Sequence, residues 1–401
     1  MTGITGLSRR TLLTAAVASP VVLRHALGET PIKIGMPAAL TGPAGEIGAQ
    51  MRRGAEFWAK HTNAKGGLLG RPIELVVQDT GGDPAAAVRK AQEVVERDGC
   101  RLLFGMTLSS EALAVVPKLA GWNAIFMSSD NGDGRLTGES LVPNFFRANT
   151  SGPMGTRAVS LYLRQAGFKS FFALGMDYAW GRNSIGVFKD EVSRAGKTMI
   201  GDIYSPIGTK DFSTYITKIR QSGADACFLV LQGDDNAAFL SQAKQYRLSD
   251  KVQLLTEIVD LNSIAAVGEA SIGLIGSSRY SFTFPGAANA EFVEAWRKDH
   301  NGAFPDVFEG EQWQAGLVLA AGITKAGSID ADKLRPALEN IEIDSIKGHV
   351  KIRACDHQGE QQGFMVKVTK KDGYEKPIPE LIATFPADQV TPACGKMTYD
   401  S

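Results

Sequence analysis

The stretch that decides the fold spans residues 32–105 and contains IKIGMPAALTGPAGEIG at 32–48, NAKGGLLGRPIELVVQDTGGDPAAAVRKAQEV at 63–94 and RLLFG at 101–105. It repeats one unit: a short apolar run of strand length, a turn rich in glycine and proline, and an amphipathic pattern of helical period. Repeated strand–helix units form parallel sheets that are covered by helices on both faces. The stretch therefore predicts an α/β fold.

The same alternation continues beyond this stretch, and most of the strand-like runs precede a helical pattern. The strand-like runs lie at residues 73–78, 101–106, 124–128, 170–176, 226–231 and 252–256. Asp83 and Pro84 predict the start of one helix, because aspartate is a favoured cap and proline fits the first turn. The chain has 401 residues, whereas a single core rarely grows past about 250 to 300, so we expect two domains.

The first 28 residues have the features of an export signal. SRRTLL at 8–13 opens an apolar stretch that ends at Leu23, and the small residues at 26–28 offer a cleavage site. The apolar part is about half of the roughly 20 residues that a membrane span needs. Residues 1–28 therefore predict a twin-arginine signal and a periplasmic protein; the alternative, a disordered basic start on a cytosolic protein, leaves the apolar run unexplained.

The charge balance limits the partners. The chain has 43 basic and 43 acidic residues, and without the three arginines of residues 1–28 it has 40 basic and 43 acidic ones. A nearly neutral protein lacks the excess of basic charge that attracts nucleic acid or an anionic membrane surface. We expect neither as a partner.

The sequence contains none of the common motifs for catalysis or metal binding. GxGxxG, the P-loop, GxSxG, CxxC and HExxH are all missing from it, and its histidines are scattered. We therefore expect no enzyme activity, no cofactor and no metal ion. The alternative is a hydrolase whose catalytic triad is assembled from distant residues.

Two of the four cysteines are candidates for a disulfide. Cys355 and Cys394 lie in the polar, loop-like segments IRACDHQ and TPACGK, and export would permit them to pair. Cys100 directly precedes the strand-like run at 101–106 and Cys227 lies inside the run at 226–231, so both are expected to be buried thiols. Four free thiols are the alternative.

In order and spacing, the segments resemble the type I periplasmic solute-binding proteins of ABC importers, in the branch that includes the leucine/isoleucine/valine-binding proteins. The segments that carry the resemblance are the run at 32–105, KDFS at 210–213, YAWG at 178–181 and LLTE at 254–257. The resemblance covers nearly the whole chain after the signal. It implies two Rossmann-like lobes with parallel sheets joined by a three-strand hinge.

The resemblance also divides the chain. Lobe 1 would comprise residues 29–149 and 281–350, and lobe 2 residues 150–280 and 351–401. The chain would cross between the lobes near 149–152, 277–283 and 349–354.

The function implied is capture of a small polar solute, an amino acid or an analogue, in the cleft between the lobes. A monomer would deliver the solute to an inner-membrane ABC permease. The alternative is a ligand sensor of the same fold that binds an amide or an aromatic acid.

Candidate ligand-binding residues of lobe 1 follow two strands, because ligands of open parallel sheets lie beyond the carboxyl ends of the strands. Ser109 or Ser110 would cap the helix that begins near Glu111, and the resemblance implies that they hold the ligand's carboxylate; a plain helix cap is the alternative. Asp130 and Asn131 replace the small residues of relatives. An aspartate repels a bound carboxylate, so either Asp130 points away or the ligand differs.

Candidate residues of lobe 2 include one large aromatic side chain and two carboxylates. Trp180 replaces a tyrosine of the family and would stack on the ligand, or would only cover the hinge. Asp234 would contact a donor of the ligand, or would cap the helix that begins near 236. The resemblance implies that Glu257 pairs with the ligand's α-ammonium group and completes a clamp for a zwitterion; a solvated loop glutamate is the alternative. It also places Phe308 as a further aromatic residue of the pocket.

Overall fold

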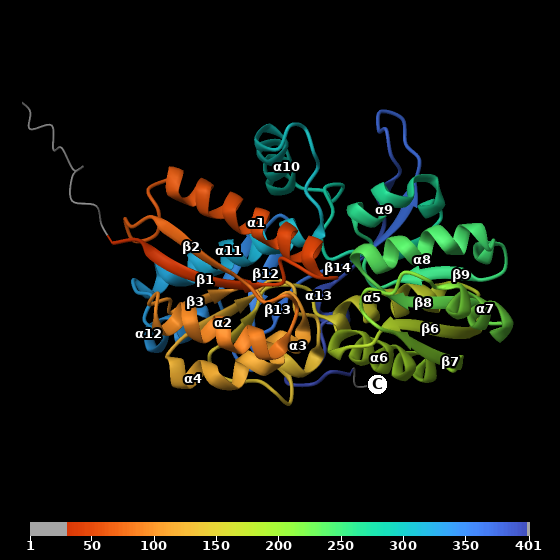
Figure 1. Ribbon diagram of the computed structural model, residues 1–401, viewed down its shortest axis with the longest axis horizontal. Coiled ribbons are helices and arrows are strands. Elements are labelled where there is room, and N and C mark those ends of the chain that lie inside the picture. The colour runs from red at the N-terminus through yellow and green to blue at the C-terminus, as the bar shows by residue number, and fades with distance from the viewer. Residues whose placement is uncertain (1–29, 399–401) are drawn as a thin grey trace, which may run out of the picture.

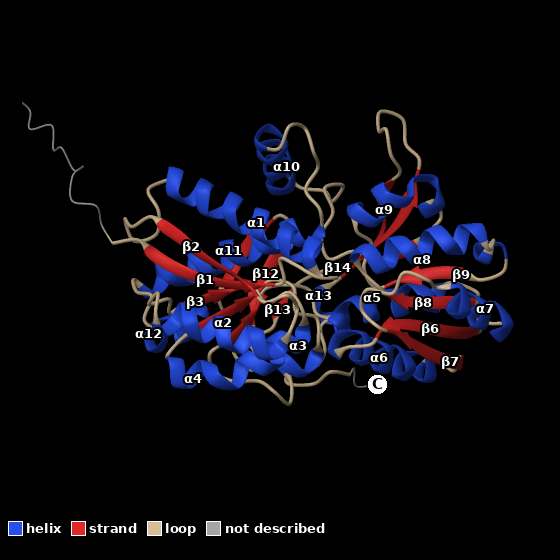
Figure 2. Cartoon of the chain, in the orientation of Figure 1, coloured by secondary structure: helices blue, strands red, loops and turns tan. Residues whose placement is uncertain are grey.

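The computed structural model describes residues 30–398 and places them in two α/β lobes that lie side by side (Figure 1). Helices cover both faces of the main sheet of each lobe (Figure 2). The predicted α/β fold with two lobes is confirmed. The export signal predicted at residues 1–28 lies outside the described residues.

Lobe 1 is built on a five-stranded parallel sheet with the order β2-β1-β3-β4-β5. Its strands are β1 (Ile32–Ala38), β2 (Ile73–Asp79), β3 (Leu102–Phe104), β4 (Ile125–Ser128) and β5 (Phe145–Arg147). Its helices are α1 (Gly45–Ala64), α2 (Pro84–Glu96), α3 (Ser109–Val115), α4 (Leu119–Trp122), α10 (Ala287–Asp299), α11 (Val307–Ala326) and α12 (Ala331–Leu338).

Alternation along the strands divides the core of lobe 1 into two layers. Phe104 of β3 packs against Trp58 of α1 with ring centroids 5.6 Å apart, whereas Leu103 belongs to the cluster that includes Val94 of α2. Successive side chains of a strand point to opposite faces, so one buried strand supplies both layers. Asp83 accepts a hydrogen bond from the backbone N–H of Ala86, which confirms the predicted start of α2.

Lobe 2 is built on a seven-stranded mixed sheet with the order β15-β14-β10-β9-β8-β6-β7, in which β14 and β15 run antiparallel to their neighbours. Its strands are β6 (Ser170–Met176), β7 (Thr198–Ser205), β8 (Ala226–Val230), β9 (Gln253–Thr256), β10 (Ile275–Ser277), β14 (Gly363–Thr369) and β15 (Ile378–Phe385). Its helices are α5 (Gly152–Gln165), α6 (Ala179–Arg194), α7 (Ser213–Ser222), α8 (Gly233–Gln245), α9 (Leu261–Val267) and α13 (Ala387–Val390).

The chain crosses between the lobes after β5, after β10 and before β14. The third crossing comes later than the predicted residues 349–354. These residues include the end of β12 (Gly348–Ile352), which pairs with β11 (Glu342–Ser345) and β13 (Gly359–Glu360) in a small antiparallel sheet. A bridge between Arg147 and Gln358 ties this sheet to lobe 1, so the chain leaves lobe 1 only at residues 361–362.

A disulfide joins Cys355 and Cys394, as expected from the sequence, and ties the end of the chain to the turn between β12 and β13. Cys100 and Cys227 are buried free thiols. Within residues 30–398, no helix combines the length and the apolar character that crossing a membrane requires.

Candidate functional site

A narrow, tightly closed cavity lies between the lobes at the carboxyl ends of β3, β4, β6 and β8, and its walls leave no space for a water molecule between them. Its walls come from lobe 1, from lobe 2 and from the second crossing between them. The lining residues are Thr107, Ser109, Asp130, Gly132, Tyr178, Trp180, Gln232 and Arg279. Three of the predicted site residues, Ser109, Asp130 and Trp180, are therefore brought together.

The lobe 1 wall presents two hydroxyl groups. The Thr107 hydroxyl oxygen accepts a hydrogen bond from the backbone N–H of Ala39 at 2.9 Å, and that of Ser109 accepts one from Asp133 at 3.2 Å. A hydroxyl group that accepts such a bond keeps its own hydrogen to donate. This wall can therefore donate two hydrogen bonds to a carboxylate.

The prediction that Ser109 or Ser110 caps α3 is wrong. The helix begins at Ser109 with Leu108 in the cap position, and the carboxylate of Glu111 accepts the backbone N–H of Leu108 at 2.7 Å. Ser109 is the first residue of the helix and lies past the cap position, so its hydroxyl group does not serve as the cap. Ser110 does not line the cavity.

Asp130 and Asn131 point in different directions. Asn131 accepts a hydrogen bond from the Ser128 hydroxyl group and donates one to the Met106 carbonyl oxygen at 2.7 Å. Its side-chain amide is therefore hydrogen-bonded within lobe 1. Asp130 faces the cavity and Arg279, and burial raises its pKa to about 7 although Arg279 acts in the opposite direction.

At Gly132 the backbone of lobe 1 lies in close contact with Trp180 of lobe 2 and with Arg279 of the second crossing. A Cβ atom added there would lie 2.6 Å from Nη2 of Arg279 and 2.6 Å from Cδ1 of Trp180. The guanidinium and the indole therefore rest directly on the backbone of lobe 1. No residue with a side chain could replace this glycine without moving both groups.

The lobe 2 wall is aromatic. Trp180 lies in the first turn of α6 with 2% of its surface exposed, and its ring centroid lies 5.9 Å from that of Tyr178. The Tyr178 hydroxyl group accepts a hydrogen bond from the Gln232 side chain at 3.1 Å. This wall offers ring faces and one polar pair.

Two other candidates of the sequence analysis do not line the cavity. Asp234 is exposed, with its carboxylate 3.8 Å from the Lys210 ammonium group. Phe308, in the first turn of α11, belongs to the apolar core. Asp234 lies on the exposed face of α8: the next residue, Asp235, is buried and accepts the backbone N–H of Gly208.

Glu257 is fully buried beside the cavity and already has partners. Its Oε1 accepts a hydrogen bond from Arg279 at 3.1 Å, and its Oε2 accepts one from Ser184 at 3.1 Å. Burial raises the pKa of Glu257, whereas the neighbouring guanidinium lowers it. Glu257 does not line the cavity, because Arg279 stands in front of it.

Arg279 is the residue that sequence reasoning missed. It lies on the second crossing, just after β10, and Nη1 donates to the Asp130 carbonyl oxygen at 2.7 Å while Nη2 donates to Glu257. Burial alone would lower the pKa of Arg279, but the carboxylates of Glu257 and Asp130 raise it. One buried cation therefore joins lobe 1 to lobe 2.

A second buried ion pair lies near the first crossing. Lys347 pairs with Glu311 of α11, and its ammonium group also lies 3.3 Å from the Thr150 hydroxyl group. This pair lines no part of the cavity. It ties the segment after β5 to lobe 1.

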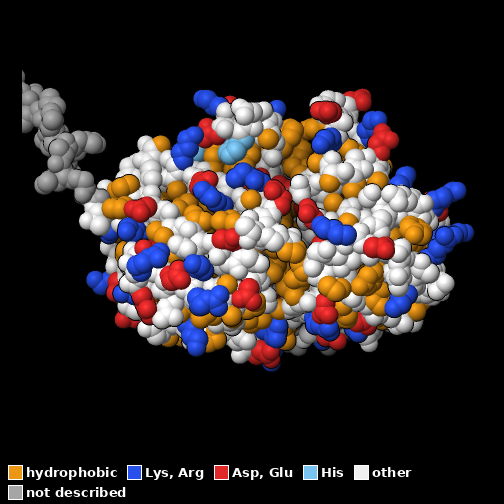
Figure 3. Space-filling model, in the orientation of Figure 1, with side chains coloured by type: hydrophobic (Ala, Val, Ile, Leu, Met, Phe, Trp, Pro, Cys, Tyr) orange, Lys and Arg blue, Asp and Glu red, His pale blue; other side chains and the backbone are white. Residues whose placement is uncertain are grey.

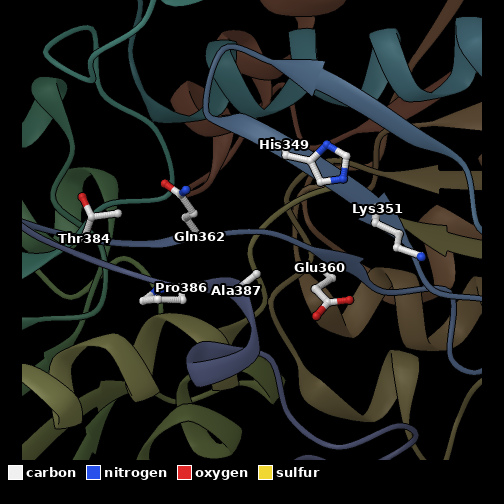
Figure 4. Close-up of a pocket in the computed structure, with 7 residues that line it drawn as sticks. All are labelled: His349, Lys351, Glu360, Gln362, Thr384, Pro386 and Ala387. Atoms are coloured by element: carbon white, nitrogen blue, oxygen red, sulfur yellow. The ribbon is translucent and has the colours of Figure 1, made fainter.

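A larger surface hollow lies over the third crossing (Figure 4). The residues that line it are His349, Lys351, Glu360, Gln362, Thr384, Pro386 and Ala387. All seven are exposed or half-buried, and Figure 4 shows them spread along the hollow rather than converging on one point. A binding site needs polar groups that converge, so the interlobe cavity is the better candidate.

Among the described residues, the one grouping with metal-ligand spacing consists of Cys355, Asp356 and Cys394. The two cysteines form the disulfide, so they offer no thiolate. Basic and acidic side chains are interspersed over the face seen in Figure 3. Neither feature points to a metal ion or a polyanion as the ligand.

Two α/β lobes with three crossings and a polar cavity between them define the class of hinged, two-lobed ligand-binding proteins. A family model for the periplasmic binding proteins matches residues 31–373, and the chain belongs to this family. It is accordingly an extracytoplasmic solute-binding protein of the kind that serves ABC transporters.

Relatives and solved structures agree with this assignment. The chain is 26% identical to the Leu/Ile/Val-binding protein homolog 6 of Brucella suis, over 85% of this chain and 88% of that protein. It is similar to an ABC transporter substrate-binding protein from Sphaerobacter thermophilus, with a TM-score of 0.82 and 26% identity over 89% of this chain and 98% of that one. A solute-binding protein from Rhodopseudomonas palustris, solved with 3,4-dihydroxybenzoic acid, has the same fold, with a TM-score of 0.83 and 22% identity over 89% and 98% of the two chains.

Proposed function

We propose that this protein captures a small solute that carries a carboxylate, an amino acid or an analogue of one, in the interlobe cavity and delivers it to an inner-membrane ABC permease. The observation that carries the proposal is the pairing of two hydroxyl donors, Thr107 and Ser109, with the aromatic wall of Tyr178 and Trp180. Hydroxyl donors suit a carboxylate, and ring faces suit the body of the solute.

Closure of the lobes explains how such a site holds its solute. A ligand that touches both walls gains its contacts only in the closed state, so binding shifts the population toward closure. The three crossings allow this hinge motion without breaking either sheet. The permease can then distinguish the closed, loaded protein from the open one.

Further parts of the proposal concern export and assembly. Residues 1–28 would direct export through the twin-arginine pathway, which carries folded proteins. The mature protein would work as a monomer in the periplasm. The disulfide between Cys355 and Cys394 suits an oxidising compartment.

Thermal unfolding of the mature protein against a panel of amino acids, amides, aliphatic acids and aromatic acids tests the proposal. A true ligand at about a thousand times its dissociation constant should add roughly 4 kcal/mol to the free energy of unfolding. We expect a rise of several degrees in Tm for one chemical class. No rise with any compound that carries a carboxylate would contradict the proposal.

A further inference from the structure

Glu257 already has hydrogen-bond partners within the protein, and this limits the class of solute that the site can bind. Both of its carboxylate oxygens accept hydrogen bonds, one from Arg279 and one from Ser184, and the residue is 0% exposed. A buried carboxylate needs a charged or hydrogen-bonded partner, and this one has both. An ammonium group of a ligand would find this partner already occupied.

Arg279 presents its guanidinium to the cavity in place of Glu257. Its Nη1 and Nη2 donate to Asp130 and Glu257, but Nε, which is buried, has no hydrogen-bond partner among the described residues. The residue as a whole is 2% exposed and lines the cavity. An unused N–H of a buried guanidinium is costly unless an acceptor meets it.

The charge of Arg279 also favours a carboxylate over an ammonium group as the part of the ligand that lies beside it. An ammonium group that entered would lie close to the guanidinium of Arg279 and would be repelled by it, whereas a carboxylate would be attracted. On the opposite wall, the hydroxyl groups of Thr107 and Ser109 can donate to the same carboxylate. Donors from lobe 1 and from the second crossing therefore line one cavity.

From these contacts we propose that Arg279 is the specificity-determining residue of the site: it stands in for the ligand's ammonium group beside Glu257, so the solute is a small carboxylic acid without an α-ammonium group. This inference rests on the proposed function and narrows the class of ligand. Trp180 and Tyr178 supply ring faces for an aromatic or apolar body. The charge of the carboxylate is met by Arg279, and the buried pair of Arg279 and Glu257 is kept.

The carboxyl group of Asp130 is compatible with a bound anion. Burial raises the pKa of Asp130 to about 7, so this carboxyl group can be neutral while an anion is bound. The guanidinium of Arg279 is then the charged group of the cavity lining that faces the bound carboxylate. A ligand with both a carboxylate and an ammonium group would bring a second cation to a place that already holds one.

Titration calorimetry on matched pairs of compounds tests the inference. The pairs are leucine with 4-methylpentanoate and phenylalanine with 3-phenylpropanoate, each of which differs in the α-ammonium group; benzoate is added as an aromatic acid. We expect the wild-type protein to bind the deaminated member of a pair at least tenfold more tightly, which corresponds to about 1.4 kcal/mol. Tighter binding of the amino acid, or equal binding of both members, would overturn the inference while leaving the proposed function standing.

The variant Arg279→Met gives the second arm of the test. Removing the guanidinium takes away the carboxylate's partner and leaves Glu257 in need of a cation. The preference should therefore reverse, with the amino acid bound more tightly than the acid. An unchanged ratio of the two affinities in a folded Arg279→Met protein would overturn the inference.

Two comparisons keep these outcomes distinct. Arg182→Met is the matched control: Arg182 lies two residues from Trp180, is exposed and pairs with Asp177, so its loss should leave the ratio as in the wild type. The wild-type comparison needs no variant and stands even if Arg279→Met does not fold. If no member of any pair binds to the wild-type protein, the proposed function fails, which differs from binding of the amino acid alone.

Discussion

The two walls of the interlobe cavity differ in the size of their side chains. Lobe 1 contributes small groups, the hydroxyl groups of Thr107 and Ser109 and the bare backbone of Gly132, whereas lobe 2 contributes the rings of Tyr178 and Trp180. The large groups of one wall and of the crossing fit against the small groups of the other. The lobe 1 wall therefore provides donors and space, and the lobe 2 wall provides the surface on which a solute packs.

The largest expected effect comes from filling the space on the lobe 1 wall. Gly132→Leu would place side-chain atoms where Arg279 and Trp180 now rest, since even a Cβ would lie 2.6 Å from each. We expect a loss of affinity of about a hundredfold or more, because both walls must separate. Calorimetry with the best ligand of the panel measures it.

Gly186→Ala is the matched control for this change. Gly186 lies in α6, and a Cβ there meets no atom within 4 Å. We expect unchanged affinity and a small rise in stability of about 0.5 to 1 kcal/mol, since alanine favours the helix. If Gly132→Leu bound the ligand as tightly as the wild-type protein does, the ligand would not bind in the interlobe cavity.

Removal of the lobe 2 surface should have the next largest effect. Trp180→Ala deletes the indole that faces Gly132 and Arg279, and we expect affinity to fall about thirtyfold, or roughly 2 kcal/mol. Trp180→Phe keeps a ring and should lose clearly less. Equal losses in the two variants, by the same titration, would show that ring stacking does not contribute.

Loss of one hydroxyl donor should have a smaller effect. Ser109→Ala removes a group that accepts from the Asp133 amide and has its own hydrogen to donate, and we expect affinity for an acid to fall about tenfold. Ser110→Ala, one residue along the same helix, should change little because Ser110 lies outside the cavity. If Ser110→Ala had the greater effect, the assignment of the lobe 1 wall would be wrong.

The smallest effect is a dependence of affinity on pH. Asp130 has a pKa raised to about 7 by burial, so it holds its proton near pH 6 and loses it near pH 8. The titratable groups that act on it are Arg279, Glu311, Glu257, Glu111 and Tyr178. Since a bound anion favours the protonated form, affinity for an acid should fall about threefold to tenfold from about pH 6 to about pH 8.

Asp130→Asn provides the test of this dependence. The amide does not titrate, so most of the slope should disappear while the ligand still binds. Calorimetry at several values of pH measures the slope for both proteins. The same slope in Asp130→Asn and in the wild type would assign the titration to a different group.

Much of the fold was predictable because it depends on local signals. The strand at 170–176 matches β6, and Asp83 caps α2 as expected, since alternation, caps and turns act within a few residues. The third crossing was placed too early because the pairing of β12 with β13 and the bridge from Arg147 to Gln358 join distant parts of the chain. A strand as short as β13 (Gly359–Glu360) has too few residues to show a periodic pattern in the sequence.

The site was predictable in its position but not in its charges. Strand ends located Ser109, Asp130 and Glu257, because the carboxyl ends of parallel strands meet at one edge of a sheet. Arg279 was missed because it lies in an interlobe segment, 149 residues from Asp130 and 22 from Glu257. The presence of Asp130, a carboxylate in place of a small residue, was the one signal in the sequence that a buried cation lay opposite.

The most direct test of the central claim is a crystal structure of the protein with the best ligand of the panel. We expect the ligand to lie in the interlobe cavity, with its carboxylate within hydrogen-bonding distance of Arg279 and its body against Trp180. A ligand found in the hollow lined by His349 and Lys351, or elsewhere outside the cavity, would show that the interlobe cavity is not the binding site.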